Sequence, residues 1–152
     1  MNKTNALRLL DTKKIRYDIL QYPTDSSIDA ISVAGYLNEN PSQVFKTLVT
    51  VSNSKANYVF VVPGDKELDL KKAAKLVNEK SIEMIPQKQL LPLTGYIHGG
   101  CSPVGMKKLF KTVILSIKLF ITKASIDQFI NSMIGPNMHL IKIFGMYFEV
   151  NC

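Results

Sequence analysis

Two apolar segments in the middle of the chain constrain the fold most. Residues 44–51 read VFKTLVTV and residues 57–62 read NYVFVV, and both are rich in β-branched and aromatic side chains. Such segments favour strands, and the polar stretch at Asn53, Ser54 and Lys55 between them is typical of a hairpin loop. The sequence therefore predicts a β-hairpin over these residues.

Helical patterns surround this predicted hairpin. Thr4, Asp29 or Ser32, and Asp69 are capping residue types, and each precedes apolar side chains at helical spacing. Further strands are expected at residues 15–20, 81–84, 112–117 and 140–150, a helical turn at 87–91 and a helix at 125–133. Helices and strands are mixed without a regular βαβ alternation. This pattern predicts a single α+β domain with a mixed or largely antiparallel sheet.

Composition sets the class of protein. With 152 residues, of which 46% are hydrophobic and 20% charged, the chain can form one domain over residues 1–152 with a core of its own. Two cysteines, Cys101 and Cys152, are too few for a disulfide framework, which favours a reducing compartment. No signal peptide and no apolar run of the ~20 residues that a membrane span needs are present. We therefore expect a cytoplasmic protein without a membrane partner.

The positive charge is concentrated in one part of the chain. The formal net charge is +7, and no acidic residue lies between Glu83 and Asp127. The lysines of that stretch are Lys88, Lys107, Lys108, Lys111, Lys118 and Lys123. A segment of one sign attracts polyanions, above all nucleic acid. A solvated lysine-rich face explains the same pattern, so charge alone leaves both interpretations open.

Lys46 departs most clearly from its local pattern. If residues 44–51 form a strand, Lys46 shares a face with Val44 and Leu48. A lysine between two apolar side chains must extend to the rim, guard an edge strand or meet an anion. The last alternative makes Lys46 a fixed cation that could orient a carbonyl, carboxylate or phosphate.

The segment at residues 95–108, GYIHGGCSPVGMKK, is the second candidate site. Gly99, Gly100 and Gly105 permit backbone conformations that bring N–H groups close to a ligand, and Pro103 stiffens the turn. Glycine-rich loops are often only turns, and the P-loop pattern is absent. Neither His98 nor His139 has the spacing of a metal site, and Cys101 is interpreted as a small apolar loop residue.

Taken together, these segments resemble the YbaK/EbsC family. The resemblance rests on YDILQY, QVFKTLV, LDLKKAAKLV, IEM and TGYIHGGCSPVGMKK in this order and covers roughly residues 4–111. The family consists of single-domain relatives of the editing domain of bacterial prolyl-tRNA synthetases. It implies a mixed, barrel-like β-sheet flanked by helices and a trans-editing deacylase that acts on aminoacyl-tRNA, chiefly Cys-tRNA(Pro), without metal or cofactor.

The resemblance also implies roles for individual residues. Lys46 matches the lysine of the aminoacyl pocket, where it would be catalytic, and Tyr22 matches a tyrosine of the same pocket. The loop that holds the reacting end of the substrate matches Gly99, Gly100, Ser102, Pro103 and Gly105. Lys107 and Lys108 match a basic pair suited to the tRNA backbone.

The implied mechanism needs no nucleophile from the protein, because the cysteine thiol of the substrate attacks its own ester. Residues 112–152 depart from the family pattern and lack its S-G-G-K-R-G-like turn. Two alternatives to the Cys-tRNA(Pro) assignment therefore remain. The substrate could carry another mischarged amino acid such as alanine, or the chain could be a binding module that has lost turnover. Whether a prolyl-tRNA synthetase takes part as a partner is also open.

Overall fold

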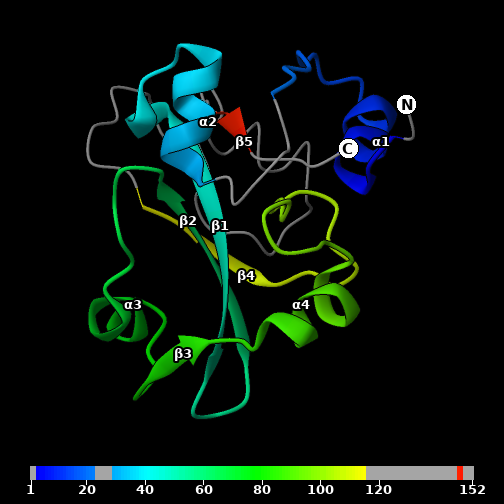
Figure 1. The fold of residues 1–152 in the computed structure, drawn as a ribbon. Helices are drawn as coiled ribbons and strands as arrows, with labels where there is room; N and C mark the ends of the chain where they lie inside the picture. The colour runs from blue at the N-terminus through cyan, green and yellow to red at the C-terminus, as the bar shows by residue number, and fades with distance from the viewer. Residues whose placement is uncertain (1–2, 23–28, 116–146, 149–152) are drawn as a thin grey trace.

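The computed structural model describes residues 3–22, 29–115 and 147–148, and its centre is a long hairpin (Figure 1). Strand β1 (Val44–Ser52) pairs antiparallel with β2 (Asn57–Pro63), with Leu48 opposite Phe60. In the connecting turn, Lys55 adopts a left-handed backbone conformation with φ 66°. The hairpin predicted from the sequence is confirmed.

Within the part of the chain that the structure describes, three short strands extend the hairpin into a mixed sheet. Strand β3 (Ile82–Met84) pairs antiparallel with the end of β1, and β5 (Tyr147–Phe148) pairs parallel with its beginning. Strand β4 (Lys111–Ile114) pairs parallel with β2, which gives the order β3-β1-β2-β4 with β5 beside β1. The predicted α+β class with a mixed sheet is confirmed. In the described residues the sheet is open and does not close into a barrel, so the expected barrel-like sheet is confirmed only as a mixed sheet.

Three of the described helices begin where the capping residues predict. Thr4 caps α1 (Asn5–Thr12), Asp29 caps α2 (Ala30–Leu37) and Asp69 caps α3 (Leu70–Leu76). Each cap side chain accepts a hydrogen bond from a backbone N–H of the first turn. A short 3-10 helix (Pro41–Gln43) leads into β1. Helix α4 (Gln87–Thr94) continues past Pro92, so it is longer than the predicted turn at residues 87–91.

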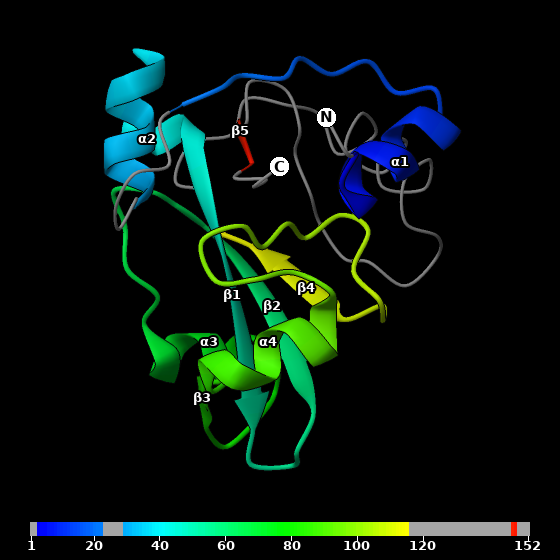
Figure 2. The ribbon, with the colours of Figure 1, turned by 45° about the vertical axis from the view of Figure 1, so that its right-hand side comes forward.

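The two faces of the hairpin are covered by different elements (Figures 1 and 2). On one face, Phe60 and Val62 pack against α3, while on the other, Val49 and Val59 contact α1, α4 and the segment before β4. This segregation follows from strand geometry, because neighbouring residues point to opposite faces. Helix α2 packs on the beginning of β1 through Val44.

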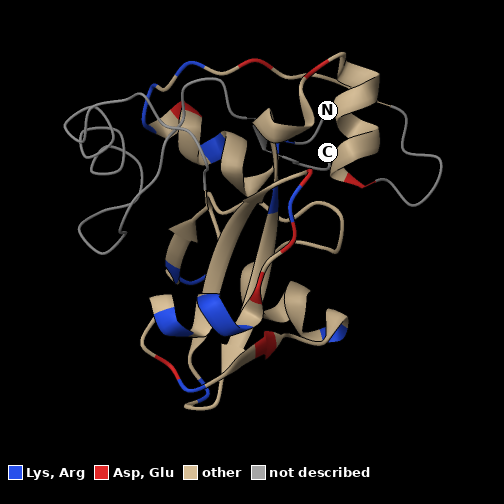
Figure 3. Cartoon of the chain, turned by 90° about the vertical axis from the view of Figure 1, so that its left-hand side faces the viewer, with Lys and Arg blue, Asp and Glu red and all other residues tan. Residues whose placement is uncertain are grey.

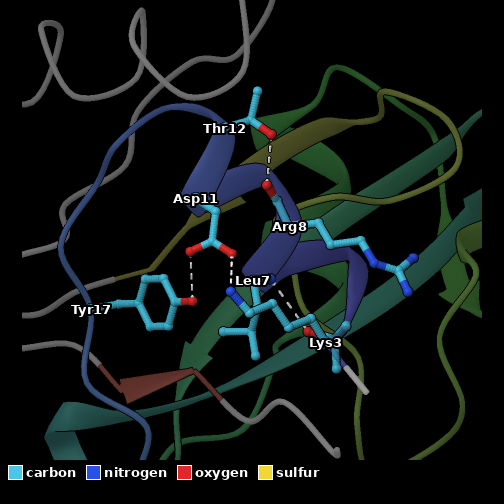
Figure 4. Close-up of polar contacts among 7 residues, drawn as sticks. Lys3, Leu7, Arg8, Asp11, Thr12 and Tyr17 are labelled. Carbon is cyan, nitrogen blue, oxygen red and sulfur yellow. Dashed lines mark hydrogen bonds and ion pairs between the residues drawn. The ribbon is translucent and has the colours of Figure 1, made fainter. Parts of the chain in front are cut away.

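The strand predicted at residues 15–20 does not form, and this prediction was wrong. The segment has β-branched residues, yet Ile19 and Leu20 are exposed and no pairing includes them within the described residues. Figure 4 shows contacts that give one physical reason. The Tyr17 hydroxyl donates a 2.9 Å hydrogen bond to the Asp11 carboxylate, and this carboxylate also accepts a 2.6 Å hydrogen bond from the Lys3 ammonium group. The segment is thereby tied to the end of α1 instead of to a strand.

Several sequence predictions fall outside the described residues. They are the helix at 125–133, most of the strand at 140–150, and the positions of Lys118, Lys123, His139 and Cys152. The pairing of β5 with β1 is the part of the last predicted strand that the structure describes. Among the described residues, no helix has the length and apolar character needed to cross a membrane.

Candidate functional site

Lys46 lies near the beginning of β1, opposite Val62 of β2. By strand alternation it shares a face with Leu48, which packs toward α3. The side chain is 22% exposed to solvent, and its Nζ donates a 2.9 Å hydrogen bond to Oε1 of Glu67. Lys46 is therefore a partly buried cation at the rim of the sheet.

A close backbone approach brings the loop that carries Glu67 to this end of β1. The Gly64 N–H donates a 2.6 Å hydrogen bond to the Val44 carbonyl. A Cβ atom at Gly64 would lie 2.8 Å from the Cβ of Ala30 and 3.0 Å from the carbonyl oxygen of Val44. Because such contacts leave no room for a side chain, glycine allows the loop to pack between β1 and the start of α2.

Asp29 adds a second carboxylate to the surroundings of Lys46. It immediately precedes Ala30 and accepts a 2.7 Å hydrogen bond from the Ser32 backbone N–H. This bond is the main cause that lowers the pKa of Asp29 below its ordinary value, and the charge of Lys46 contributes further. One lysine therefore lies in the field of two carboxylates.

Tyr22 packs beside the same end of the sheet. It is half-buried against the α2 cluster of Ala30, Val33, Ala34 and Val44. Val44 and Lys46 are two residues apart on one strand, so their side chains leave the same face. The structure thus brings Tyr22 and Lys46, two of the predicted pocket residues, to one region.

The glycine-rich loop lies between α4 and β4, next to α1 (Figure 2). Its Cys101 and Val104 pack with Val49 and Val59 in the core. Ser102 is only 1% exposed, and its hydroxyl accepts a 3.1 Å hydrogen bond from the Val104 N–H. Pro103 and Gly100 are buried as well, and Gly99 has φ +80°. Most side chains in the middle of this loop are therefore buried in the protein core and are not exposed to solvent.

Gly105 has a structural requirement that the sequence does not reveal. Its φ is +73°, and a Cβ atom there would lie 2.8 Å from the carbonyl carbon of Asn5 and 2.9 Å from the Ala6 nitrogen. Only glycine combines this backbone conformation with so close a contact. Gly105 therefore holds the loop against the first turn of α1, whatever it contributes to a substrate.

The predicted site residues form two groups in the structure. Lys46 and Val49 are three positions apart on β1, so their side chains leave opposite faces. The buried loop side chains pack on the Val49 face, whereas Lys46 lies with Tyr22 and Glu67 toward α2 and α3. That one substrate contacts both groups stays a prediction.

Lys107 and Lys108 are exposed where the loop leads toward β4. The Lys107 stem lies over Gly95, with its Cγ 3.1 Å from the position of a Cβ atom on that glycine. Its backbone N–H donates a 2.9 Å hydrogen bond to the Thr94 carbonyl. The backbone of Lys107 is thus held in place while both side chains remain accessible to an anion.

Cys101 lacks the environment of a nucleophile. Burial raises the pKa of its thiol to about 11, since a thiolate is disfavoured away from water. His98 is exposed, and the described residues contain no group of three or more metal-ligating side chains. The interpretation of Cys101 as a small apolar loop residue agrees with this burial.

Sequence reasoning missed two members of the Lys46 surroundings. Glu67 lies 21 residues from Lys46, and no short motif connects them. Asp29 was identified only as a helix cap. The sequence signal that could have pointed to Glu67 is the group of acidic residues after Gly64, at Asp65, Glu67 and Asp69. That this acidic segment lies beside β1 depends on the packing of α2, which the sequence does not show.

Known proteins are similar to this chain over a part that contains Lys46, Glu67 and the glycine-rich loop. The family model described as the aminoacyl-tRNA editing domain matches residues 26–127. A protein of Enterococcus faecalis, provisionally named Cys-tRNA(Pro)/Cys-tRNA(Cys) deacylase EbsC, is 46% identical over 113 residues. The alignment covers 74% of this chain and 69% of that protein.

Solved structures share the fold. One, provisionally described as a trans-editing enzyme for prolyl tRNA synthetase, has a TM-score of 0.65 and 26% identity. The match covers 75% of this chain and 73% of the other. A second, the crystal structure of a hypothetical protein, has a TM-score of 0.64 and 25% identity, with 73% of each chain covered.

Proposed function

The chain belongs to the aminoacyl-tRNA editing domain family, and we propose that it removes cysteine wrongly attached to tRNA(Pro). The printed name of the Enterococcus faecalis relative supports cysteine as the amino acid. The coarser assignment, editing of aminoacyl-tRNA in the service of translation fidelity, follows from the family itself. The tRNA is accordingly the expected partner.

The observation that carries the proposal is the position of Lys46. Its ammonium group is partly buried on β1 and bonded to a carboxylate that is 93% exposed. Because the Glu67 carboxylate is solvated, its ion pair with Lys46 contributes little stability, and breaking the pair on substrate binding costs little. Once released, the ammonium could donate to the ester carbonyl oxygen, where negative charge develops during acyl transfer.

The proposed reaction uses the thiol of the substrate. The cysteine sulfur, as a thiolate, forms a bond to its own carbonyl carbon, and the ester C–O bond then breaks. The 3′ oxygen of the tRNA takes up a proton as it leaves, and a thiolactone is the other product. The protein holds the reacting groups together and stabilises the oxyanion. The raised pKa of Cys101 agrees with a reaction in which that residue supplies no nucleophile.

The exposed pair Lys107 and Lys108 is proposed to contact the tRNA backbone. Both lie in the stretch from Glu83 to Asp127 without acidic residues, so no carboxylate nearby in sequence opposes an incoming phosphate. Such contacts position a nucleic acid without reading its sequence. Lys107 and Lys108 would therefore not select tRNA(Pro) among other tRNAs by themselves.

A deacylation assay tests the proposed function. Cysteinyl- and alanyl-tRNA(Pro) are incubated side by side with the purified protein, and the low-molecular-weight product is identified. We expect faster loss of cysteine and formation of the thiolactone. Faster loss of alanine would reassign the amino acid, and binding without turnover of either would make the chain a binding module.

A further inference from the structure

We propose that Glu67 binds the α-ammonium group of the amino acid that is to be removed. This inference rests on the proposed function and deepens it by assigning one subsite. Every aminoacyl ester of tRNA carries an ammonium group next to the ester carbonyl. A site that places a cation on the carbonyl oxygen therefore also needs an anion for the neighbouring nitrogen.

The geometry supplies both charges side by side. The Lys46 Nζ and Glu67 Oε1 are 2.9 Å apart, and the two side chains come from different elements, β1 and the loop before α3. In an α-amino ester, the nitrogen and the carbonyl oxygen are separated by only three bonds. Two neighbouring protein groups of opposite charge are thus matched to the two ends of the reacting unit.

The backbone on both sides of Glu67 is anchored. Gly64 bonds to Val44, and Asp69 accepts 3.0 Å hydrogen bonds from the backbone N–H groups of Lys71 and Lys72. The Glu67 side chain itself is 93% exposed. The carboxylate is therefore fixed in approximate position by its loop, but it can turn from Lys46 toward a bound ammonium group.

The local charge balance favours an added cation. Lys46 contributes one positive charge, whereas Glu67 and Asp29 contribute two negative charges near it. Asp29 already accepts the Ser32 N–H as a helix cap, so Glu67 is the better placed of the two carboxylates to change partner. Figure 3 shows that acidic residues lie on the loop before α3, whereas the charged residues of α3 itself are basic.

The competing explanation is a surface ion pair that serves only Lys46. Glu67→Gln distinguishes the two, because it keeps the shape of the side chain and removes the charge. The variant is assayed on cysteinyl-tRNA(Pro) and on N-acetyl-cysteinyl-tRNA(Pro), in which no ammonium group exists. Each substrate is compared between wild type and variant, so that the intrinsic reactivity of the two esters cancels.

We expect kcat/KM to fall about 10-fold or more on the free amino acid ester and less than about 2-fold on the acetylated one, as loss of a charge-assisted hydrogen bond predicts. Asp65→Asn is the matched control, since Asp65 is in the same loop and pairs with Lys66 at 3.6 Å. It should affect neither substrate. An equal loss on both substrates in Glu67→Gln, or no loss on either, overturns the proposal.

A binding measurement keeps this test separate from the proposed function. The probe is tRNA(Pro) with cysteine in amide linkage to a 3′-amino group, with the α-nitrogen free or acetylated. Wild type should prefer the free form, and Glu67→Gln should lose that preference. Absence of a preference in wild type overturns the role of Glu67. A preference that persists without any deacylation of the ester overturns only the proposed reaction.

Discussion

The Tyr96 hydroxyl donates a 2.6 Å hydrogen bond to the backbone carbonyl of Val104, eight residues further along the glycine-rich loop. Tyr96 is 6% exposed, and burial raises its pKa to about 12, because the phenolate would lose its hydration. Cys101, inside the same loop, has its pKa raised to about 11 for the same reason. The folded state therefore disfavours ionisation of two groups in this loop.

These raised pKa values predict a loss of stability in alkali. In the unfolded chain the thiol and the phenol release their protons near pH 9.0 and 10.0, but in the folded protein only near 11 and 12. The stabilisation is complete below about pH 9 and declines as pH rises toward 12. Urea unfolding measured at intervals above pH 8 should show this decline.

Tyr96→Phe provides the control for the alkaline effect. At neutral pH the variant should be less stable by about 1 kcal/mol, because the bond to Val104 is lost. Its stability should then decline less steeply in alkali than that of wild type. Tyr36→Phe, at a tyrosine that is 58% exposed, should change neither value. Identical alkaline slopes for wild type and Tyr96→Phe would contradict the assignment.

Gly105→Ala should destabilise the protein by about 2 kcal/mol or more, since φ is positive and the new Cβ meets the α1 backbone. Gly35→Ala is the matched control: it lies within α2 and nothing is within 4 Å of its Cβ position. That change should stabilise by about 0.5–1 kcal/mol through helix propensity. Thermal unfolding of both variants measures the difference. A tolerated Gly105→Ala would refute the close contact with α1.

Lys46→Ala should lower the deacylation rate by on the order of 100-fold, the usual cost of removing one oxyanion donor. The fold should stay intact, because the change removes a partly exposed charge and no core side chain. Lys55→Ala, in the exposed hairpin turn, is the control and should retain full activity. Single-turnover rates and circular dichroism together check this. Near-normal turnover in Lys46→Ala would mean that Lys46 only forms an ion pair with Glu67 at the surface.

Lys107→Glu combined with Lys108→Glu should weaken tRNA binding and reduce the slope of log K against log salt by roughly 1–2. The comparison pair is Lys71→Glu with Lys75→Glu on α3, on the other face of the hairpin. That pair should leave the slope unchanged. Filter-binding titrations at several salt concentrations give the slopes. Equal slopes for wild type and the Lys107 and Lys108 variant would assign these lysines to a merely solvated face.

The substrate thiol should matter more than any thiol of the protein. Seryl-tRNA(Pro) differs from the cysteinyl form by one atom, yet an alcohol does not ionise where a thiol does, near pH ~8.5. We expect a large loss of rate on the seryl substrate and only a small one in Cys101→Ser. Comparable rates on both substrates would favour attack by water. An inactive but folded Cys101→Ser protein would make Cys101 the nucleophile.

Local signals predicted most elements of the fold. Thr4, Asp29 and Asp69 cap helices as expected because an N-cap depends only on its own first turn. The hairpin formed because its two strands are adjacent in sequence. The failure at residues 15–20 has the opposite cause, since strand formation there required a distant neighbour that propensity cannot supply.

The candidate site was less predictable than the fold. Lys46 was identifiable because its charge interrupts an apolar strand pattern, which is a local feature. Glu67 was not, because its contact with Lys46 depends on the Gly64 approach to α2. The tight fit of Gly105 against Asn5 likewise becomes visible only when α1 is packed on the loop.

The parallel pairing of β5 with β1 has a consequence for synthesis. Val44 pairs with Tyr147, so the beginning of β1 receives this neighbour only after about a hundred further residues have been translated. The β1–β2 hairpin, a local contact, can form on the nascent chain long before. Until β5 has been synthesised, the unpaired edge of β1 next to Lys46 can pair with strands of other chains. We expect premature release of the chain to produce aggregation that starts at this edge.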